Sequence, residues 1–539
     1  MTNKKKSLNT SNSKTNEPVI DRRSFVFSTS AALTGTMLFS CVGKFGASPS
    51  NISVDGSVKI DYSAKGPVMP DNFMGFSYEL AQLMNPKFFS PENTELVSLF
   101  KALSPNGVLR LGGNSSESCW LKVDENTTAP KMRSVDTKDE EHWMPRDLFM
   151  LPASSIISLA GFLKATGWSL VYGFNFGNSS KEQLAKEAEF IYKHVKDYLL
   201  YFQIGNEPDF YPAANNRTRP KDWGFNDYLT EWTACAEEIL KEVPTAVFGG
   251  PDVGSSSDWI KRFIPEASEK LGKRLVAVSG HYYPMGPPDD PTVNTQRLFK
   301  TNKKVGADTK SIVDTASKYN FGYRMTEGNS CFRGGKPGTS DTLASALWGG
   351  EYLSILATEG CVGVNLHGGS RNILKAALNN HLPGENVASA SESDSKGSFY
   401  TPIAGEIDFG FSARPLLHAM FMVNQLTGSE MKRVSVDCQN MDVTAFAGVE
   451  NKETKLLIFN KELEKSINLK VALPEGVKSG KLWRLTGPSL DSRKGILLAG
   501  SEIKPGAKWE PKEIEACTIS ESSCVVSVPA TSAVIIFFD

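Results

Sequence analysis

Residues 201–208 read Tyr201-Phe-Gln-Ile-Gly-Asn-Glu-Pro208, a short apolar run that is followed by a glutamate. A second run of this kind, Tyr323-Arg-Met-Thr-Glu-Gly-Asn329, carries Glu327 near its end. Apolar runs without polar alternation are typical of strands that are buried on both faces of a parallel sheet. A side chain at the carboxyl end of such a strand points into the pocket in which barrel enzymes carry out their chemistry. Glu207 and Glu327 therefore indicate both a fold and a reaction.

Eight runs of this type lie between Asn72 and Gly369, and helical patterns separate most of them. Eight strands that alternate with helices are what a closed (β/α)8 barrel needs. We therefore predict an α/β fold, a (β/α)8 TIM barrel that is the catalytic domain, over residues 69–408. The predicted strands are 73–79, 108–113, 170–177, 201–207, 246–252, 276–283, 323–327 and 362–367. The predicted helices are 94–103, 153–166, 181–195, 228–240, 258–271 and 340–358, and Ser340 or Asp341 is expected to cap the last one.

After Leu416 the sequence changes to short alternating strands with Gly, Pro and Lys between them. This pattern is typical of a β-sandwich. We expect residues 409–539 to form a barrel-closing helix and a flanking C-terminal β-sandwich, and residues 42–68 to be a linker with N-terminal strands that join this sandwich. The strands expected in the sandwich are 443–449, 455–459, 482–485 and 533–538, with 53–62 added from the N-terminal side.

The first 41 residues have the order of an export signal. Asp21-Arg-Arg-Ser-Phe25 precedes a mildly apolar run and resembles a twin-arginine signal, and Leu38-Phe-Ser-Cys41 resembles a lipobox whose cysteine is lipidated. The apolar run is about fifteen residues long, shorter than the roughly twenty that a transmembrane helix needs. We expect residues 1–41 to be a twin-arginine-like lipoprotein signal, Cys41 to carry the lipid, and the protein to be exported to the cell envelope, in the periplasm or on the cell surface. Its contact with the membrane would be made only through this anchor.

The composition argues against several kinds of partner. The 539 residues are 40% hydrophobic and 22% charged, with a formal net charge of −1. A near-neutral balance provides no basic field that gathers phosphates, so we expect no nucleic-acid partner. The eight cysteines include no Cys-x-x-Cys pair and no histidine cluster near them, so we expect neither a metal site nor a cofactor. Cys517 and Cys524 are the best candidates for a disulfide.

Two carboxylates about 5–5.5 Å apart are what hydrolysis of a glycosidic bond with retention requires, one of them protonated and the other ionised. Glu207 suits the acid/base, and Asn206 before it can donate a hydrogen bond to the sugar 2-hydroxyl. Glu327 suits the nucleophile, because Arg110 would project from a neighbouring strand end and hold it ionised. The sequence therefore predicts a pair of glutamates whose surroundings, and not their residue type, set their proton states.

Eight motifs that follow one another between residues 71 and 418 resemble the family 79 glycoside hydrolases, the heparanase and β-glucuronidase family. The resemblance implies a (β/α)8 barrel with a flanking β-sandwich, and double displacement with Glu207 as acid/base and Glu327 as nucleophile. It also implies a glucuronic-acid-containing oligosaccharide or glycoconjugate as the substrate. The matching stretches are Gly75-Phe-Ser-Tyr-Glu79, Leu109-Arg-Leu-Gly-Gly-Asn114, Gly205-Asn-Glu-Pro208, Gly280-His-Tyr-Tyr-Pro284, Met325-Thr-Glu-Gly-Asn329, Ser340-Asp-Thr-Leu-Ala-Ser-Ala-Leu-Trp348, Val364-Asn-Leu-His-Gly368 and Phe399-Tyr-Thr-Pro-Ile403.

The resemblance further implies contacts to a glucuronic acid residue. The family reads the sugar carboxylate with a tyrosine hydroxyl and with backbone N–H groups after the eighth strand, and Tyr400, with Gly397 and Ser398, falls at that position. Hydrogen bonds to a charged group contribute about 1.5–3 kcal/mol each, which is enough to favour a uronide over a neutral sugar. The other expected contacts are Glu79 and Asn114 to sugar hydroxyls, His367 near the ring, and Tyr282 or Tyr283 near the nucleophile.

One position departs from the family pattern. Phe332 stands where the family often has a tyrosine five residues after the nucleophile, and Arg333 and two glycines follow it. A guanidinium fork fits a carboxylate, so Arg333 could pair with the uronate or with an anionic aglycone. Arg333 could equally be a solvated loop cation.

Two other functions are compatible with the same residues. The first is a retaining β-glycosidase of the same clan that acts on a neutral sugar, such as a xyloside or a galactoside. The second is a non-catalytic, lipid-anchored carbohydrate-binding protein, although both carboxylates and Asn206 are intact. Turnover of aryl β-glucuronides against aryl β-xylosides and β-galactosides distinguishes among the three.

Overall fold

The computed structural model describes residues 53–133, 147–213, 218–300, 304–380, 382 and 392–539. The expected export signal and the lipidated Cys41 lie outside the described residues. Within the described ranges, no helix combines the length and the apolar character that are needed to cross a bilayer.

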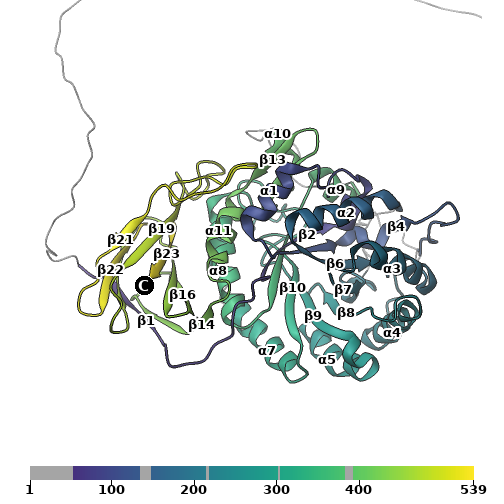
Figure 1. Ribbon diagram of the computed structural model, residues 1–539, viewed down its shortest axis with the longest axis horizontal. Helices are drawn as coiled ribbons and strands as arrows, with labels where there is room; N and C mark the ends of the chain where they lie inside the picture. The colour runs from purple at the N-terminus through teal and green to yellow at the C-terminus, as the bar shows by residue number, and fades with distance from the viewer. Residues whose placement is uncertain (1–52, 134–146, 214–217, 301–303, 381, 383–391) are drawn as a thin grey trace, which may run out of the picture. The chain divides into compact units, whose positions relative to one another are not determined.

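Eight parallel strands close into a barrel in the order β10-β11-β2-β3-β6-β7-β8-β9, and β9 pairs with β10 to complete the ring. Each of the eight predicted runs contributes one barrel strand, so the prediction of a (β/α)8 barrel is confirmed (Figure 1). The strands are β2 (Met74–Glu79), β3 (Val108–Gly112), β6 (Ser169–Phe174), β7 (Leu199–Ile204), β8 (Phe248–Val253), β9 (Leu275–Tyr282), β10 (Gly322–Gly328) and β11 (Gly363–Gly368).

Helices between the strands surround the barrel, and three of them have the predicted bounds: α1 (Thr94–Leu103), α2 (Ala153–Thr166) and α3 (Lys181–Val195). The start of α3 is fixed by a capping box between Ser180 and Gln183, which satisfies N–H groups that have no partner inside the helix. The remaining large helices of the layer are α4 (Phe225–Glu242), α5 (Ser257–Leu271), α7 (Val305–Ser317) and α8 (Leu343–Thr358). The short α6 (Thr295–Lys300) and α7 were not predicted.

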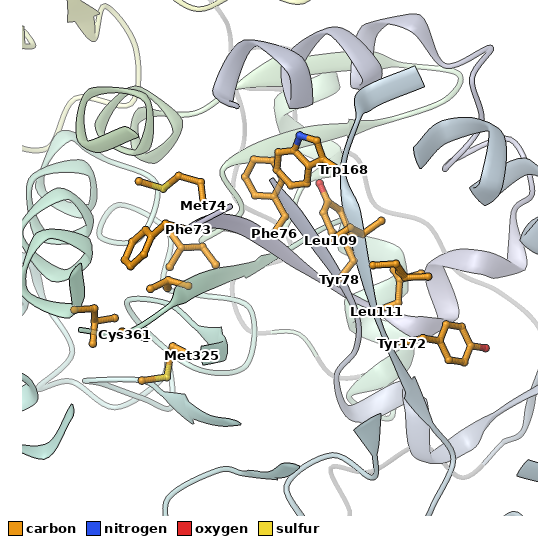
Figure 2. Packing of buried hydrophobic residues seen from close by; sticks show 14 of the residues in the cluster. Phe73, Met74, Phe76, Tyr78, Leu109, Leu111, Trp168, Tyr172, Met325 and Cys361 are labelled. Carbon is orange, nitrogen blue, oxygen red and sulfur yellow. The ribbon is translucent and has the colours of Figure 1, made fainter. Parts of the chain in front are cut away.

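The space between the barrel strands and the helices is filled by large apolar side chains. Phe76 of β2 stacks on Trp168 with ring centroids 5.2 Å apart, and both side chains are buried. Figure 2 shows these two rings together with residues of β3, such as Leu109 and Leu111, that pack between the strands and the helices. The indole N–H of Trp168 donates to the Ser104 carbonyl at 2.8 Å, so its one polar group is also satisfied.

The start of α8 differs from the prediction, because neither Ser340 nor Asp341 caps it. The Ser340 hydroxyl accepts from the Lys336 N–H, and Asp341 accepts from the Gly338 N–H at 2.7 Å. The first N–H groups of α8 instead donate to carbonyls of the C-terminal part of the chain, those of Ser492 (2.9 Å) and Leu490 (3.0 Å). The sandwich therefore supplies the cap of a barrel helix.

Two sheets pack face to face in the C-terminal part, as the alternating pattern predicted, and a buried apolar core lies between them. The strand β1 (Gly56–Ile60) pairs with both β15 and β18, so the N-terminal strand does join the sandwich. Cys517 and Cys524 are free thiols, so the predicted disulfide between them is wrong. One sheet has the order β15 (Val434–Asp437), β1, β18 (Ile467–Ala472), β22 (Ser523–Val528), and the other β14 (Glu430–Lys432), β16 (Val443–Glu450), β17 (Glu453–Asn460), β23 (Ser532–Phe538), β19 (Gly480–Thr486), β20 (Leu497–Leu498), with β21 (Glu515–Cys517) beside β19.

The barrel meets the sandwich at α8 and α11 (Pro415–Asn424), which Figure 1 shows between the barrel strands and the C-terminal sheets. Glu351 of α8 is buried there and pairs with the Lys461 ammonium at 2.9 Å. The remaining elements are η1 (Leu80–Met84), η2 (Asn114–Ser118), β4 (Cys119–Lys122), β5 (Phe149–Pro152), η3 (Pro208–Phe210), η4 (Gly272–Arg274), α9 (Arg371–Ala377), α10 (Glu392–Lys396), β12 (Ile403–Glu406), β13 (Gly410–Ala413) and α11 (Pro415–Asn424).

Candidate active site

A cavity of about 340 Å³ opens at the carboxyl ends of the barrel strands. This is the end at which barrel enzymes carry their functional residues. Eight of the residues proposed from the sequence line it: Glu79, Asn114, Glu207, Tyr283, Glu327, Arg333, His367 and Tyr400. The other lining residues are Phe210, Ala213, Gly254, Ser255, Phe332, Leu374 and Leu378.

The two predicted carboxylates face each other across this cavity. Glu327 lies within β10, the seventh barrel strand along the chain, whereas Glu207 follows the end of β7 by three residues. Glu207 adopts a left-handed backbone conformation with φ 48° and ψ 51°, which is uncommon for a residue with a side chain. One carboxylate oxygen of Glu207 and one of Glu327 lie within 4.8 Å of each other. The folded chain thus brings together two acids that lie far apart in the sequence.

Glu327 is held in its ionised form. Its carboxylate accepts hydrogen bonds from the Arg110 guanidinium at 2.7 Å and from the Tyr283 hydroxyl at 2.7 Å. Burial alone would raise the pKa of Glu327, but interactions with His367, His281 and Arg110 outweigh it and lower this pKa to about 2. The side chain is therefore a carboxylate at neutral pH.

Glu207 has the opposite tendency. Burial raises the pKa of Glu207 above its ordinary value, and the negative charge of Glu327 adds to this effect, while a hydrogen bond with His281 opposes it. The two glutamates of the cavity are therefore driven toward different proton states, with Glu207 the more readily protonated. A pair of acids separated in this way can divide the roles of proton donor and nucleophile between them.

His281 connects Glu207 with a second buried acid, and the sequence analysis assigned it no role. Its Nδ1 lies 2.9 Å from Glu207 Oε1, and its Nε2 lies 3.2 Å from Asp252 Oδ1. Burial disfavours the charged ring, but Asp252 and Glu327 outweigh burial and raise the pKa of His281 to about 10. The signal that pointed to it was its place in Gly280-His-Tyr-Tyr-Pro284, at the carboxyl end of β9.

Glu207, His281 and Glu327 also have the spacing of a metal site. A histidine binds a metal through a neutral ring nitrogen with a free lone pair. A ring whose pKa is raised to about 10 is protonated at both nitrogens near neutral pH, and each of the two faces a carboxylate oxygen. In this structure the three side chains form an acid–imidazolium network, in which each ring nitrogen of His281 faces a carboxylate oxygen.

Arg110 organises the floor of the cavity from inside the barrel. It is fully buried and donates to Asp252 at 2.6 Å and to Asn206 Oδ1 at 2.8 Å, in addition to Glu327. Arg110 was expected at a strand end next to that of Glu327, but β11 and β2 lie between β3 and β10 in the barrel order, so its side chain reaches across the interior. Because Asn206 accepts through its oxygen, its amide N–H groups are oriented toward Asn114, whose Oδ1 lies 3.4 Å away.

Glu117, which no sequence pattern had singled out, supports the turn that carries Asn206 and Glu207. Its Oε1 accepts the backbone N–H of Asn206 at 2.6 Å, and its Oε2 accepts the N–H of Gly177. Burial raises the pKa of Glu117 to about 7, although hydrogen bonds from Tyr211 and from these backbone groups oppose the rise. A buried carboxyl thereby fixes the backbone immediately before Glu207.

Of the two tyrosines expected near Glu327, the structure selects Tyr283. Its hydroxyl donates to Glu327 Oε1, whereas the Tyr282 ring stacks on Tyr352 with centroids 5.3 Å apart. Successive side chains of a strand point to opposite faces, so the two neighbours cannot both face the cavity. Of the two alternatives, Tyr283 lines the cavity and Tyr282 is not among its lining residues.

The backbone after the eighth strand also departs from the expectation. The backbone N–H groups around Gly397 and Ser398 were expected to face a sugar carboxylate together with the Tyr400 hydroxyl. The Ser398 N–H donates instead to the Gly369 carbonyl (3.0 Å), and the Tyr400 N–H donates to the Gly334 carbonyl (3.3 Å). These donors are occupied within the protein, so this loop offers the cavity the side chain of Tyr400 and not the N–H groups of Ser398 and Tyr400.

The side of the cavity next to Glu207 is largely apolar. Phe210, Ala213, Gly254 and Ser255 line it. A Cβ atom on Gly254 would lie 2.9 Å from the Glu207 carboxyl carbon and 2.3 Å from the Phe210 ring, so a glycine is required for this close approach. A ligand group that lies beside Glu207 would therefore meet an aromatic ring.

Comparison with known proteins gives relatives of moderate similarity. No protein-family model matches the chain. A β-glucuronidase of Aspergillus niger is 26% identical over 351 residues, which are 60% of this chain and 62% of the relative. A β-glucuronidase of Neurospora crassa is 25% identical over 354 residues, which are 58% of this chain and 60% of the relative. The chain thus matches about three fifths of the length of these curated relatives.

The architecture also has counterparts among solved structures. A 4-O-α-L-rhamnosyl-β-D-glucuronidase from Fusarium oxysporum, solved as a complex with Rha-GlcA, superposes with a TM-score of 0.68 and covers 90% of this chain and 99% of that one. The sequence identity is 15%, so this likeness concerns the fold. The closed barrel with its flanking sandwich is therefore an arrangement known from solved proteins.

Proposed function

We propose that the protein is a β-glucuronidase that hydrolyses glucuronic-acid-containing glycans or glycoconjugates by double displacement with retention of configuration. Glu327 attacks the anomeric carbon and forms a glycosyl-enzyme bond, while Glu207 protonates the oxygen of the leaving group. Glu207 then removes a proton from the water that releases the sugar.

One observation carries this proposal: two glutamates that face one cavity are driven toward different proton states. Their nearest oxygens lie within 4.8 Å, which suits direct attack by one carboxylate better than the wider spacing of about 6.5–9.5 Å between carboxyl groups that leaves room for a water. Burial raises the pKa of Glu207, whereas interactions with His367, His281 and Arg110 lower that of Glu327.

The choice of sugar rests on separate support. Two relatives named β-glucuronidase align with this chain over about three fifths of their own length. A solved glucuronidase has the same fold as this chain. Barrels of this kind host many sugar specificities, so the fold alone leaves the sugar undecided. We propose the remaining contacts by their positions around the cavity: Glu79, Asn114 and Asn206 to hydroxyls, His367 beside the ring, Tyr283 to Glu327, and Tyr400 to the sugar carboxylate.

Hydrolysis of aryl glycosides that share one aglycone tests the proposal. We expect turnover of the β-glucuronide to exceed that of the β-xyloside and the β-galactoside. Proton NMR of the reaction should show β-glucuronic acid first, before it mutarotates to the α-anomer. A 2-fluoro glucuronyl fluoride should label the protein at Glu327, which peptide mapping detects. Preference for a neutral sugar, the α-anomer as first product, or saccharide binding without turnover would each contradict the proposal.

We also propose export and lipidation for this chain, on the basis of its twin-arginine-like motif and of the lipobox-like residues that end at Cys41. Radiolabelled fatty acid should then be incorporated into the wild-type protein and not into Cys41→Ser. Equal labelling of both forms, or recovery of wild-type protein without lipid, would contradict the anchor.

A further inference from the structure

Several carboxylates line the cavity, and their negative charge disfavours binding of an acidic sugar. Glu79, Glu207 and Glu327 all line it. Even with Glu207 protonated, a bound uronate would bring its own negative charge close to the others, and like charges in a partly buried site repel each other strongly. A cation that faces the sugar carboxylate would offset this repulsion and favour a uronic acid.

Two buried side chains at the floor of the cavity contact these acids. Arg110 is fully buried and pairs with Glu327 and Asp252. The His367 ring lies 3.4 Å from Glu79 through Nε2 and 3.6 Å from Glu327 through Nδ1. These contacts hold the acids at the floor of the cavity, and a residue of the cavity wall can meet the carboxylate of a bound sugar.

Arg333 is placed on that wall. It lines the cavity beside Phe332, whose ring stands edge-to-face to Tyr283 with centroids 6.4 Å apart. Tyr283 in turn bonds to Glu327. Arg333 thus lines the cavity next to a residue that packs on Tyr283, the tyrosine that bonds to Glu327.

The backbone around Arg333 is held in an unusual conformation that connects it with Tyr400. Arg333, Gly334 and Gly335 all have positive φ, at 60°, 89° and 81°. The Gly334 carbonyl accepts the N–H groups of Phe399 (2.8 Å) and Tyr400 (3.3 Å). A left-handed conformation is unfavourable for a residue with a side chain and persists where the surroundings enforce it, often at functional sites.

We infer that Arg333 binds the carboxylate of the uronic acid together with the Tyr400 hydroxyl. The Gly334 carbonyl, next to Arg333, accepts the Tyr400 N–H, so one backbone contact joins the two residues. The planar fork of an arginine matches a carboxylate with two parallel hydrogen bonds. This inference rests on the proposed β-glucuronidase function and names the residue that sets its preference for an acidic sugar.

The test compares 4-nitrophenyl β-D-glucuronide with 4-nitrophenyl β-D-glucoside, which share a neutral aglycone and differ at the sixth carbon. Arg333→Gln should lower kcat/KM on the glucuronide by about 10- to 100-fold, the worth of a hydrogen-bonded charge, and change kcat/KM on the glucoside by less than about threefold. Arg333→Lys should recover part of the loss, because it keeps the charge without the fork. Glutamine retains the Cβ atom, so it leaves the backbone conformation under the same constraint.

Arg262→Gln is the matched control, because Arg262 pairs with Glu266 on the outside of the barrel. It should leave both substrates unaffected. Equal losses on glucuronide and glucoside in Arg333→Gln would overturn the carboxylate role. A loss confined to 4-carboxyphenyl β-D-glucoside would overturn it too and would assign Arg333 to the aglycone.

Binding of free glucuronate and glucose, measured by calorimetry, separates this inference from the proposed function. Wild-type protein should bind glucuronate more tightly than glucose, and Arg333→Gln should remove most of the difference. The wild type could show this binding pattern and yet not hydrolyse the glucuronide. That result would contradict the proposed catalysis and would still support the role of Arg333 in binding the carboxylate. Normal turnover with an unchanged binding difference in Arg333→Gln would overturn the inference and leave the catalysis standing.

Discussion

The Nδ1 atom of His281 lies 2.9 Å from Oε1 of Glu207, and the same ring approaches Asp252 with its other nitrogen at 3.2 Å. The contact lowers the pKa of Glu207, which burial alone raises. A protonated imidazole beside the proposed general acid therefore limits how far the proton affinity of that acid can rise.

His281→Gln should move the alkaline limb of the activity profile to higher pH. Glutamine can still donate to Glu207 but carries no charge, so the pKa of Glu207 rises further. A general acid is active while it is protonated, and a higher pKa extends activity toward higher pH. The pH dependence of kcat/KM on an aryl β-glucuronide measures the shift. His194→Gln on α3, where the ring contacts the Phe190 carbonyl, is the control, and an unchanged limb in His281→Gln would contradict the coupling.

The two proposed catalytic glutamates should respond differently to removal. Glu327→Ala should abolish turnover, because it removes the group that forms the glycosyl-enzyme bond. Glu207→Ala should lose about 10²- to 10⁴-fold on leaving groups that need a proton and much less on a nitrophenolate, which leaves without one. Added azide should restore turnover in Glu207→Ala and yield a β-glycosyl azide.

Rates on an oligosaccharide and on a nitrophenyl glycoside, with product analysis by NMR, measure this difference. Glu266→Ala, on the outer helix α5, is the control. Wild-type rates in either glutamate variant, or identical leaving-group dependence in both, would show that the two roles are assigned to the wrong residues.

Arg110→Met should weaken the fold most at neutral pH. Removal of one partner from a buried ionic network costs about 3–5 kcal/mol, because the other charges lose their compensation. The pKa of Glu327 is lowered in the folded state from 4.5 to about 2. Its contribution to stability is therefore present above about pH 4.5 and is lost as the pH falls toward 2. Without Arg110 this pKa rises, and the free energy of unfolding becomes less sensitive to acid.

Urea unfolding at pH 7 and at pH 4, followed by tryptophan fluorescence, measures both effects. The difference in unfolding free energy between wild type and Arg110→Met should be smaller at pH 4 than at pH 7. Arg262→Met removes an exposed arginine and should be close to neutral. A difference that stays constant with pH would mean that Arg110 stabilises the fold by packing alone.

The barrel was predictable from the sequence because its strands are continuous apolar runs. Burial on both faces leaves a strong local signal, and each of the eight runs forms a strand. The helix α7 escaped prediction because its buried face is Val305, Thr309, Ile312 and Ala316, which includes two small or polar side chains. The cap of α8 could not be predicted either, since the carbonyl of Ser492 that supplies it belongs to a distant part of the chain.

A residue of the site was predictable from the sequence only where it belongs to a local sequence pattern. Glu207 and Glu327 could be located because each closes an apolar run, and a strand end in a barrel faces the cavity. Glu117 and Asp252 act through contacts with residues from other strands, and no spacing along the chain encodes those contacts. The choice between Tyr282 and Tyr283 depends on strand orientation, which becomes fixed only when the register of the barrel is known.

Gly254→Ala should impair the proposed proton transfer and leave the fold intact. The added methyl group would lie 2.3 Å from the Phe210 ring and 2.9 Å from the carboxyl carbon of Glu207, so both side chains must shift. A misplacement of about 1 Å at a reacting group costs on the order of 100-fold in rate. The loss in kcat should be larger on oligosaccharides than on nitrophenyl glycosides. Gly224→Ala, where nothing lies within 4 Å of the new atom, is the control, and equal behaviour of the two variants would contradict the proposed crowding.

Tyr400→Phe should cost about 10- to 100-fold in kcat/KM on a glucuronide, the value of one hydrogen bond to a charged group, and distinctly less on the glucoside with the same aglycone. Tyr400 is buried and lines the cavity. Tyr352→Phe is the control, because its hydroxyl has no hydrogen-bond partner and lies outside the cavity-lining set. Equal losses on both sugars would remove the recognition role of Tyr400.

The double variant of Tyr400→Phe and Arg333→Gln then reports whether both side chains address one group. Two donors to the same carboxylate are coupled, so the loss in the double variant should differ from the product of the single losses. Additive losses on the glucuronide would place the two donors on separate parts of the substrate. Coupling that appears on the glucuronide and is absent on the glucoside would assign both to the carboxylate, since that group is the one in which the two sugars differ.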